Sequence, residues 1–460
     1  MHTFKRLSLS ALFVLSGCSL APEYQRPASP VPQQFSVRHN ALVTTPGEYQ
    51  DSGWRNFFVD PQVKTLIDEA LRYNRDLRMA LLKVQEARAQ YQVTDADRYP
   101  QLDAQSSGSW QGNIQGNSAT DRQYDAGLNL SFDLDFFGRL KNMSEADRQN
   151  YLASEEARRA VHILLIANVS QSYFNQRLAY AQLQVAEETL RNYLRSYAFI
   201  EKQLLTGSTN VLALEQARGM IESTRSEIAK RKGELAQANN ALQLLVGRYS
   251  SLPDDNHRSR GDINSVVLPP ALSSQILLQR PDIMEAEHQL MAANANIGAA
   301  RAAFFPSITL TSGVSGSSSD LSRLFDAASG MWRFMPKVDI PIFNAGRNQA
   351  QLDIAEIRQQ QAVVNYEQKI QNAFKQVADA LALRQSLADQ ITAQQRYLDS
   401  LQITLQRANA LYQHGAVSYI NVLDAERSLF STRQTLLDLN YSRQVNEITL
   451  FTALGGGWVE

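Results

Sequence analysis

The residue with the most reactive side chain in this sequence, cysteine, occurs only once, as Cys18. It directly follows Leu15-Ser16-Gly17, and the positively charged Lys5 and Arg6 precede a short apolar stretch. This order is typical of a bacterial lipoprotein signal. A single cysteine excludes a disulfide within the chain and a cysteine metal cluster. We therefore expect residues 1–17 to be removed and the Cys18 thiol to be lipidated; an incidental cysteine in an ordinary signal peptide is the alternative.

Methionine and histidine side chains offer the next candidate chemistry, because clustered thioethers bind soft ions such as copper(I) and silver(I). Only Met284, His288 and Met291, and separately Met331 and Met335, lie close together in the sequence. The first three share one helical face beside small packing positions, so they are expected to fill a core rather than bind metal. The sequence predicts no metal site and no resident cofactor.

Sequence motifs for catalysis are absent. We find no glycine-rich phosphate loop, no His-Glu-x-x-His motif and no nucleophile elbow. The 45 basic and 46 acidic side chains of the 460 residues nearly balance, which gives no electrostatic signature of nucleic-acid binding. The sequence therefore predicts a protein that is neither an enzyme nor a nucleic-acid-binding protein.

The hydrophobic pattern limits how the chain can meet a membrane. After Cys18 no apolar stretch approaches the roughly 18 residues of a membrane-spanning helix. Ser19 follows the lipidation position, whereas Asp there would favour retention in the inner membrane. We therefore expect a protein anchored by lipid in the outer membrane, either tethered there or forming a β-barrel.

The chain contains two copies of one large unit. Five short stretches recur in the same order at an offset of about 208 residues. The pairs are Tyr99–Leu102 with Phe305–Ile308, Gly138-Arg139 with Gly346-Arg347, Leu204–Gly207 with Leu411–Gly415, Leu214–Arg218 with Leu423–Arg427, and Leu245–Gly247 with Ala453–Gly455. Such a long period predicts two copies of one supersecondary unit rather than a solenoid of small repeats.

Each copy is predicted to run helix, strand, strand, long helix, tight turn, long helix. The first helix is expected over 63–97 in copy one and 281–304 in copy two. Proline-free stretches over 141–204 and 349–413 predict helices of roughly 95 Å at about 1.5 Å per residue. The expected boundaries are a signal peptide at 1–17, an extended lipid-anchored segment at 18–60, repeat one at 61–247, a linker at 248–272, repeat two at 273–455 and a tail at 456–460.

The predicted strands alternate strictly between apolar and polar residues. Even positions from Tyr124 to Leu134 are mostly apolar and odd ones are polar, and Trp332 and Phe334 alternate with Arg333 in copy two. Strands are expected at about 101–113, 123–136, 307–317 and 331–343. Their length suits membrane-crossing barrel strands, although a sheet with one solvated face is the alternative. Four strands per chain close no barrel, but three chains would supply twelve.

The same stretches resemble a known family. Arg280-Pro281-Asp282-Ile283, the stretch from Ile297 to Pro306, the Gly415 turn with Val422–Ala425, and the opening Leu20–Tyr24 are similar to the TolC-like outer-membrane factors, in their lipoprotein branch. The resemblance covers essentially the whole mature chain. Phe136–Met143 and the ending Gly455–Trp458 are most similar to the channels of copper and silver exporters of the Cus and Sil type.

The resemblance implies an architecture and partners that the residue pattern alone does not. The fold class is mixed α and β, and a homotrimer forms a 12-stranded outer-membrane β-barrel continuous with a periplasmic α-helical barrel. A periplasmic adaptor and an inner-membrane pump of the resistance–nodulation–division class would be its partners, with outer-membrane lipid around the barrel.

The resemblance also assigns candidate gate residues at the two helical turns, Thr206–Asn210 and His414–Ser418. It places Tyr412 and Asp424 at gating positions, and Asn421 where relatives often have an acid. Glu215 and Arg218 in copy one are possible partners. Alternatively, Asp424 and Arg427 are solvated surface charges.

These observations predict a passive exit channel of a tripartite efflux system that conducts copper(I) or silver(I). The same duct serving drugs or other organic molecules is the alternative. A lipid-tethered coiled-coil scaffold without a pore is the third interpretation.

Overall fold

The computed structural model describes residues 19–35, 53–112, 121–249, 263–266 and 272–456. Cys18, the signal peptide and most of the expected linker lie outside the described residues. The chain divides into two units. We call them the sheet unit (Met1–Ser29, Leu81–Ala157 and Asp282–Lys369) and the hairpin unit (Pro30–Ala80, Arg158–Pro281 and Ile370–Glu460).

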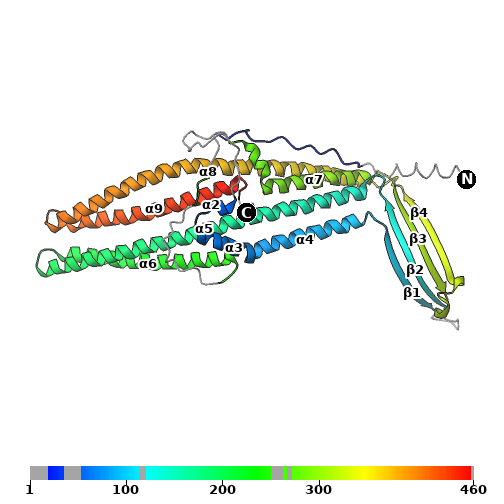
Figure 1. The fold of residues 1–460 in the computed structure, drawn as a ribbon, viewed down its shortest axis with the longest axis horizontal. Coiled ribbons are helices and arrows are strands. Elements are labelled where there is room, and N and C mark those ends of the chain that lie inside the picture. Colours follow the sequence, from blue (N-terminus) through cyan, green and yellow to red (C-terminus); the bar gives the residue numbers. More distant parts are fainter. Residues whose placement is uncertain (1–18, 36–52, 113–120, 250–262, 267–271, 457–460) are drawn as a thin grey trace. The chain divides into compact units, whose positions relative to one another are not determined.

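The sheet unit is built around one antiparallel sheet of four strands in the order β1-β2-β3-β4 (Figure 1). The strands are β1 (Gln101–Gln111), β2 (Asp121–Leu134), β3 (Ser307–Ser318) and β4 (Gly330–Asp339). β2 and β3 come from different repeats and pair along their length, for example at Leu128 and Val314. The sheet therefore joins the two repeats through backbone hydrogen bonds.

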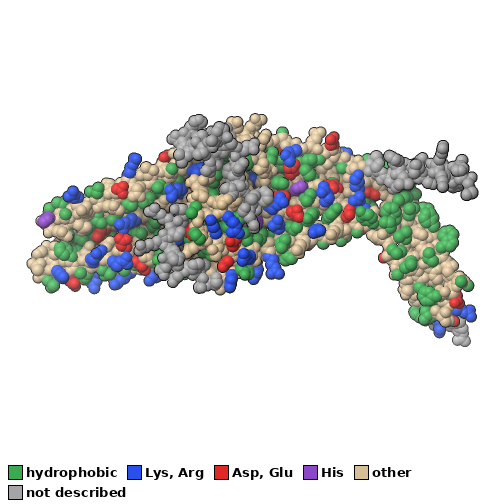
Figure 2. Space-filling view, in the orientation of Figure 1, with side chains coloured by type: hydrophobic (Ala, Val, Ile, Leu, Met, Phe, Trp, Pro, Cys, Tyr) green, Lys and Arg blue, Asp and Glu red, His purple; other side chains and the backbone are tan. Residues whose placement is uncertain are grey.

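The register of the sheet puts its apolar side chains on one face. Leu128 lies opposite Val314, which lies opposite Trp332, so these three side chains share a face. Trp332 is 81% exposed and Val314 64% exposed. Hydrophobic side chains gather over the strands, and charged ones gather near the β1–β2 turn (Figure 2). The intervening residues, such as Asp125, Asn129 and Thr309, make the other face polar. An exposed apolar face of this kind marks a surface that contacts lipid or protein.

The hairpin unit consists of long antiparallel helices. α5 (Arg139–Leu205) continues through a tight turn into α6 (Val211–Val246), and α8 (Arg347–Gln413) continues into α9 (Tyr419–Ala453) (Figure 1). α5 and α8 each have 67 residues, and the boundary between the two units falls inside both. With α7 (Pro281–Ala302), these elements confirm the predicted fold class of two copies of helix, strand, strand and two long helices. None of the described helices is long and apolar enough to cross a membrane.

Glycines recur at the same spacing in both copies for a conformational reason. Three pairs of glycines 208 positions apart all adopt positive φ, which L-residues with a side chain rarely adopt. The pairs are Gly138 and Gly346 before the long helices, Gly207 and Gly415 in the tight turns, and Gly247 and Gly455 after the last helix of each copy. The repeat seen in the sequence is therefore partly a repeat of left-handed turns.

One expected helix is two helices in the structure. The stretch expected as a single helix over 63–97 forms α3 (Pro61–Tyr73) and α4 (Arg75–Ala96), separated at Asn74. The Asn74 backbone is extended, and its Oδ1 accepts from the backbone N–H groups of Asp76 and Leu77 at 2.9 and 3.0 Å. Asn74 thus caps α4 at its N-terminus. Because its Nδ2 also donates to the Leu245 carbonyl oxygen at 2.8 Å, the break fixes α3 to the end of α6.

Arg280 holds the start of the second copy to its end. Its side chain is buried, and Nη1 donates to the Ala453 carbonyl oxygen at 2.7 Å, while Nη2 donates to Gln376 Oε1 at 3.0 Å. A guanidinium at the last carbonyls of α9 also opposes the negative end of the helix dipole. This contact accounts for the arginine of the Arg280-Pro281-Asp282 motif.

The described N-terminal segment lies against α7 in the sheet unit. Arg26 Nε and Nη2 donate to the two carboxylate oxygens of Glu287 at 2.7 and 2.9 Å, and the Tyr24 hydroxyl donates to Glu287 Oε1 at 3.1 Å. Asn294 also donates to the Pro22 carbonyl oxygen at 2.8 Å. These contacts fix the chain that follows Cys18.

Candidate gate at the turns of the helical hairpins

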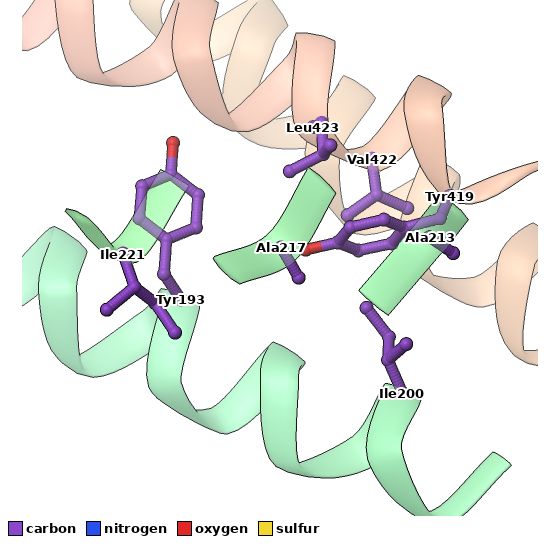
Figure 3. Close-up of a cluster of buried hydrophobic side chains, with 8 residues drawn as sticks. All are labelled: Tyr193, Ile200, Ala213, Ala217, Ile221, Tyr419, Val422 and Leu423. Carbon is purple, nitrogen blue, oxygen red and sulfur yellow. The ribbon is translucent and has the colours of Figure 1, made fainter. Parts of the chain in front are cut away.

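Both helical hairpins of the hairpin unit reverse at a glycine. Gly207 lies in the α5–α6 turn and Gly415 in the α8–α9 turn, both with positive φ. A buried apolar cluster from α5, α6 and α9 lies behind these turns (Figure 3). Its members are Tyr193, Ile200, Ala213, Ala217, Ile221, Tyr419, Val422 and Leu423. The cluster packs the start of α9 against the first hairpin.

The two turns differ in how the second helix begins. Asn210 Oδ1 accepts from the Ala213 backbone N–H at 3.0 Å and so caps α6. Ser418, the corresponding residue before α9, makes no side-chain cap bond in the described chain. Instead the Asn421 side chain donates to the Ser418 carbonyl oxygen and contacts its hydroxyl, both at 3.3 Å. Asn421, one of the candidate gate residues, thus makes local contacts within its own turn.

Tyr412 joins the two hairpins. Its hydroxyl donates to Gln203 Oε1 of α5 at 2.7 Å, and its ring centroid lies 5.5 Å from that of Tyr419 and 6.4 Å from that of Phe199. Burial raises the pKa of the Tyr412 hydroxyl, so it stays protonated and able to donate at neutral pH. The position that the resemblance assigned to gating therefore carries a contact between hairpins.

Asp424 and Arg427 form a loose pair on α9. Arg427 Nη1 lies 3.7 Å from Asp424 Oδ1, and both side chains are more than half exposed. The closer contact of Arg427 is with α6, because its Nε and Nη2 lie 3.2 and 3.1 Å from the Met220 sulfur. Arg427 therefore connects α9 to α6 through a thioether as well as pairing with Asp424.

Glu215 and Arg218 pair with each other. Arg218 Nη1 lies 3.4 Å from Glu215 Oε1, one turn along α6, and both side chains are exposed. Exposed pairs at this spacing contribute little stability. The proposed role of these two residues as partners of the second hairpin thus gains no support from their contacts within one chain.

Glu426 is a residue that sequence reasoning missed. It lies on α9 between Ala425, which is buried, and Arg427. Its Oε2 atom is buried and has no hydrogen-bond partner among the described residues. Burial raises the pKa of this carboxyl group to about 7. Its charge is among the groups that raise the pKa of the Tyr193 and Tyr419 hydroxyls, so both aromatic residues lie close to it.

Of the soft side chains noted in the sequence, the histidine has a polar partner and two methionines lie on the sheet. His288 Nδ1 lies 2.7 Å from Gln149 Oε1, which engages one of its two ring nitrogens. Met331 and Met335 are about half exposed on the polar face of β4. No group of three or more histidine, cysteine, aspartate or glutamate side chains is placed to hold an ion within the described ranges.

Four strands with one apolar face, long helical hairpins and polar contacts at the hairpin turns define the class of protein. The chain belongs to the outer membrane efflux protein family, whose pattern matches residues 66–248 and 272–456. It is accordingly an outer-membrane channel protein, as the sequence predicted, and not an enzyme.

Named relatives narrow this class. The chain is 77% identical over 458 residues to the cation efflux system protein CusC of Escherichia coli, with all of both chains covered. It is 72% identical over 461 residues to the probable outer membrane lipoprotein SilC of Salmonella typhimurium, again with all of both chains covered. A crystal structure of CusC, 78% identical, matches with a TM-score of 0.89 and covers 96% of this chain and 100% of its own.

Proposed function

We propose that three copies of this chain form the exit duct of a tripartite efflux system that conducts copper(I) or silver(I) out of the cell. Full-length identity of 77% to a cation efflux protein is the observation that carries the choice of cargo. The metal ions are cargo that passes through, so the duct needs no tight metal site.

The sheet supports the trimer. Four strands per chain cannot close on themselves, whereas twelve strands from three copies suit a closed barrel with no free edge. In such a barrel the face with Leu128, Val314 and Trp332 contacts lipid, and the face with Asn129 and Thr309 lines a water-filled lumen. The helical hairpins then form the periplasmic tunnel, and their turns meet the periplasmic adaptor and the resistance–nodulation–division pump.

The cargo is tested by survival on graded silver and copper at low oxygen, in parallel with a panel of drugs. One strain has the gene deleted and a second has it restored, and both retain the native pump partners. Sensitivity to metal without sensitivity to drugs supports the proposal. Sensitivity to drugs alone contradicts the assignment of cargo and leaves the duct in place.

The duct itself is tested by the conductance of purified trimers in a planar lipid bilayer. A stepwise current that requires the trimer supports a pore. A coiled-coil scaffold without a pore gives no current under the same conditions.

Lipidation of Cys18 is part of the same proposal. Cys18→Ser removes the only thiol that can carry an acyl chain. We expect the variant to lose incorporation of a labelled fatty acid, while Cys18 in the parent protein incorporates it. Equal incorporation by both proteins contradicts the assignment.

A further inference from the structure

An acidic side chain occupies an unusual place near the α8–α9 turn. Glu426 Oε2 is buried, and the described residues provide no hydrogen-bond donor for it. A buried carboxylate normally has a cation or several N–H donors, because removing the charge from water costs several kcal/mol. Among the described residues Glu426 Oε2 has no such partner, although α9 packs against α5 and α6 at this point.

The groups around Glu426 do not compensate for its charge. From α5, the Tyr193 ring is buried beside it, and from α9 itself come Tyr419 and Arg427. The Arg427 guanidinium is engaged by the Met220 sulfur and by Asp424. From α6, the packed residues Met220 and Ile221 carry no ionisable group. The ionised form of Glu426 is therefore poorly accommodated in this packing.

We propose that Glu426 is a proton-controlled latch, which holds the start of α9 against α5 and α6 when it is protonated and loosens this packing when it ionises. The latch acts near the α8–α9 turn, where the Tyr412 hydroxyl of α8 donates a hydrogen bond to Gln203 of α5. Its effect on conduction rests on the proposed duct, whereas its effect on helix packing does not.

The direction of the pH effect follows from the shift in the pKa of the Glu426 carboxyl group. Burial raises its pKa from 4.5 to about 7. A raised pKa means that the packed state keeps the proton to higher pH than the unpacked one. The contribution to packing is therefore complete below about pH 4.5, declines as pH rises toward 7, and stays lost above it. Over this range the packing equilibrium shifts by up to roughly two orders of magnitude.

The latch is tested first by a distance, with no reference to conduction. Spin labels on Glu222→Cys in α6 and Ser431→Cys in α9 report the spacing of two exposed positions. Pulsed electron resonance is measured between about pH 4 and pH 8, which brackets the expected transition. In the parent protein we expect the distance distribution to broaden and shift to longer distances as pH rises. The Glu426→Gln variant should show, at every pH, the distribution that the parent protein has at acidic pH.

Glu201→Gln provides the matched control. This change removes the same charge from an exposed acid of α5, so the pH response of the labels should persist. A distance that does not change with pH in the parent protein overturns the latch, as does an unchanged pH response in Glu426→Gln.

Bilayer conductance of the same proteins then separates the latch from the duct. A rise in current with pH that Glu426→Gln abolishes supports both proposals. A pH-dependent distance in trimers that conduct no current supports the latch and contradicts the duct. A steady current in trimers whose label distance does not change with pH supports the duct and contradicts the latch.

Discussion

The Tyr412 hydroxyl donates to Gln203 Oε1 at 2.7 Å, so the last turn of α8 and the last turn of α5 share a hydrogen bond. This bond joins the two repeats at the end where each hairpin reverses. It is specific to its partners, because an amide oxygen accepts the hydroxyl proton over a narrow range of distance and angle. A gate that opens by separating the hairpins must break it.

Replacing Tyr412 by Phe removes this bond and keeps the ring that contacts Tyr419. We expect a loss of about 1 kcal/mol of packing per chain and a larger fraction of open channels in bilayer recordings. Tyr397→Phe, an exposed tyrosine of the same helix, is the control and should leave the current unchanged. Identical currents for Tyr412→Phe and the parent would remove Tyr412 from the gate.

Arg427 is expected to matter more than Asp424. Asp424→Asn breaks only an exposed pair at 3.7 Å and should change the free energy of unfolding by less than about 0.5 kcal/mol. Arg427→Ala also removes the contact with the Met220 sulfur and the packing of its alkyl stem, and should cost about 1 kcal/mol or more. Urea titrations of the two purified variants measure their free energies of unfolding. A larger loss for Asp424→Asn than for Arg427→Ala contradicts the expectation that Arg427 matters more.

Arg280 is expected to be a stability residue. Arg280→Met leaves the Ala453 carbonyl oxygen and Gln376 without their donor, at a cost of about 2–3 kcal/mol. Arg280→Lys should recover little, because an ammonium group does not reproduce the two-pronged geometry of a guanidinium. Urea unfolding measures both variants. If Arg280→Lys matches the parent, charge alone accounts for the role.

Alanine substitutions at two glycines with nearly equal φ distinguish the cost of backbone strain from the cost of steric overlap. Gly247 and Gly415 have φ of 76° and 73°, so alanine at either position costs about 1–2 kcal/mol from the backbone alone. A Cβ at Gly247 would also lie 2.5 Å from the Tyr73 carbonyl oxygen, whereas a Cβ at Gly415 would have none of the described residues within 4 Å. We expect Gly247→Ala to destabilise the protein clearly more than Gly415→Ala in urea titrations. Equal losses would mean that α3 moves away from Gly247 at no cost.

The long helices and the strands could be predicted from the sequence because their patterns are local. Alternation along β2 and the absence of proline through α5 and α8 depend on residues that are near in the chain. The break at Asn74 was missed because apolar periodicity continues across it. An asparagine in a helical pattern is a weak signal until its contact with Leu245, far away in the sequence, is known.

The candidate site was less accessible to sequence reasoning. The resemblance pointed to Tyr412 and Asp424. The bond from Tyr412 to Gln203 follows from packing between repeats, and so does the contact of Arg427, the partner of Asp424, with Met220. Glu426 carries no sequence signal at all. From the sequence, a glutamate beside Arg427 in a long polar helix is expected to be a solvated charge. Only the packing of the helices shows that Glu426 Oε2 is buried.

The different starts of α6 and α9 bear on how firmly each hairpin turn is held. Asn210 caps α6, whereas Ser418 makes no such side-chain bond at the described start of α9. The first turn of α9 therefore costs less to unwind, by about 1 kcal/mol for a missing cap. The two halves therefore keep the same left-handed turns in the backbone and differ in how firmly the second helix of each hairpin begins. A force that pulls equally on both turns would unwind the start of α9 before the start of α6.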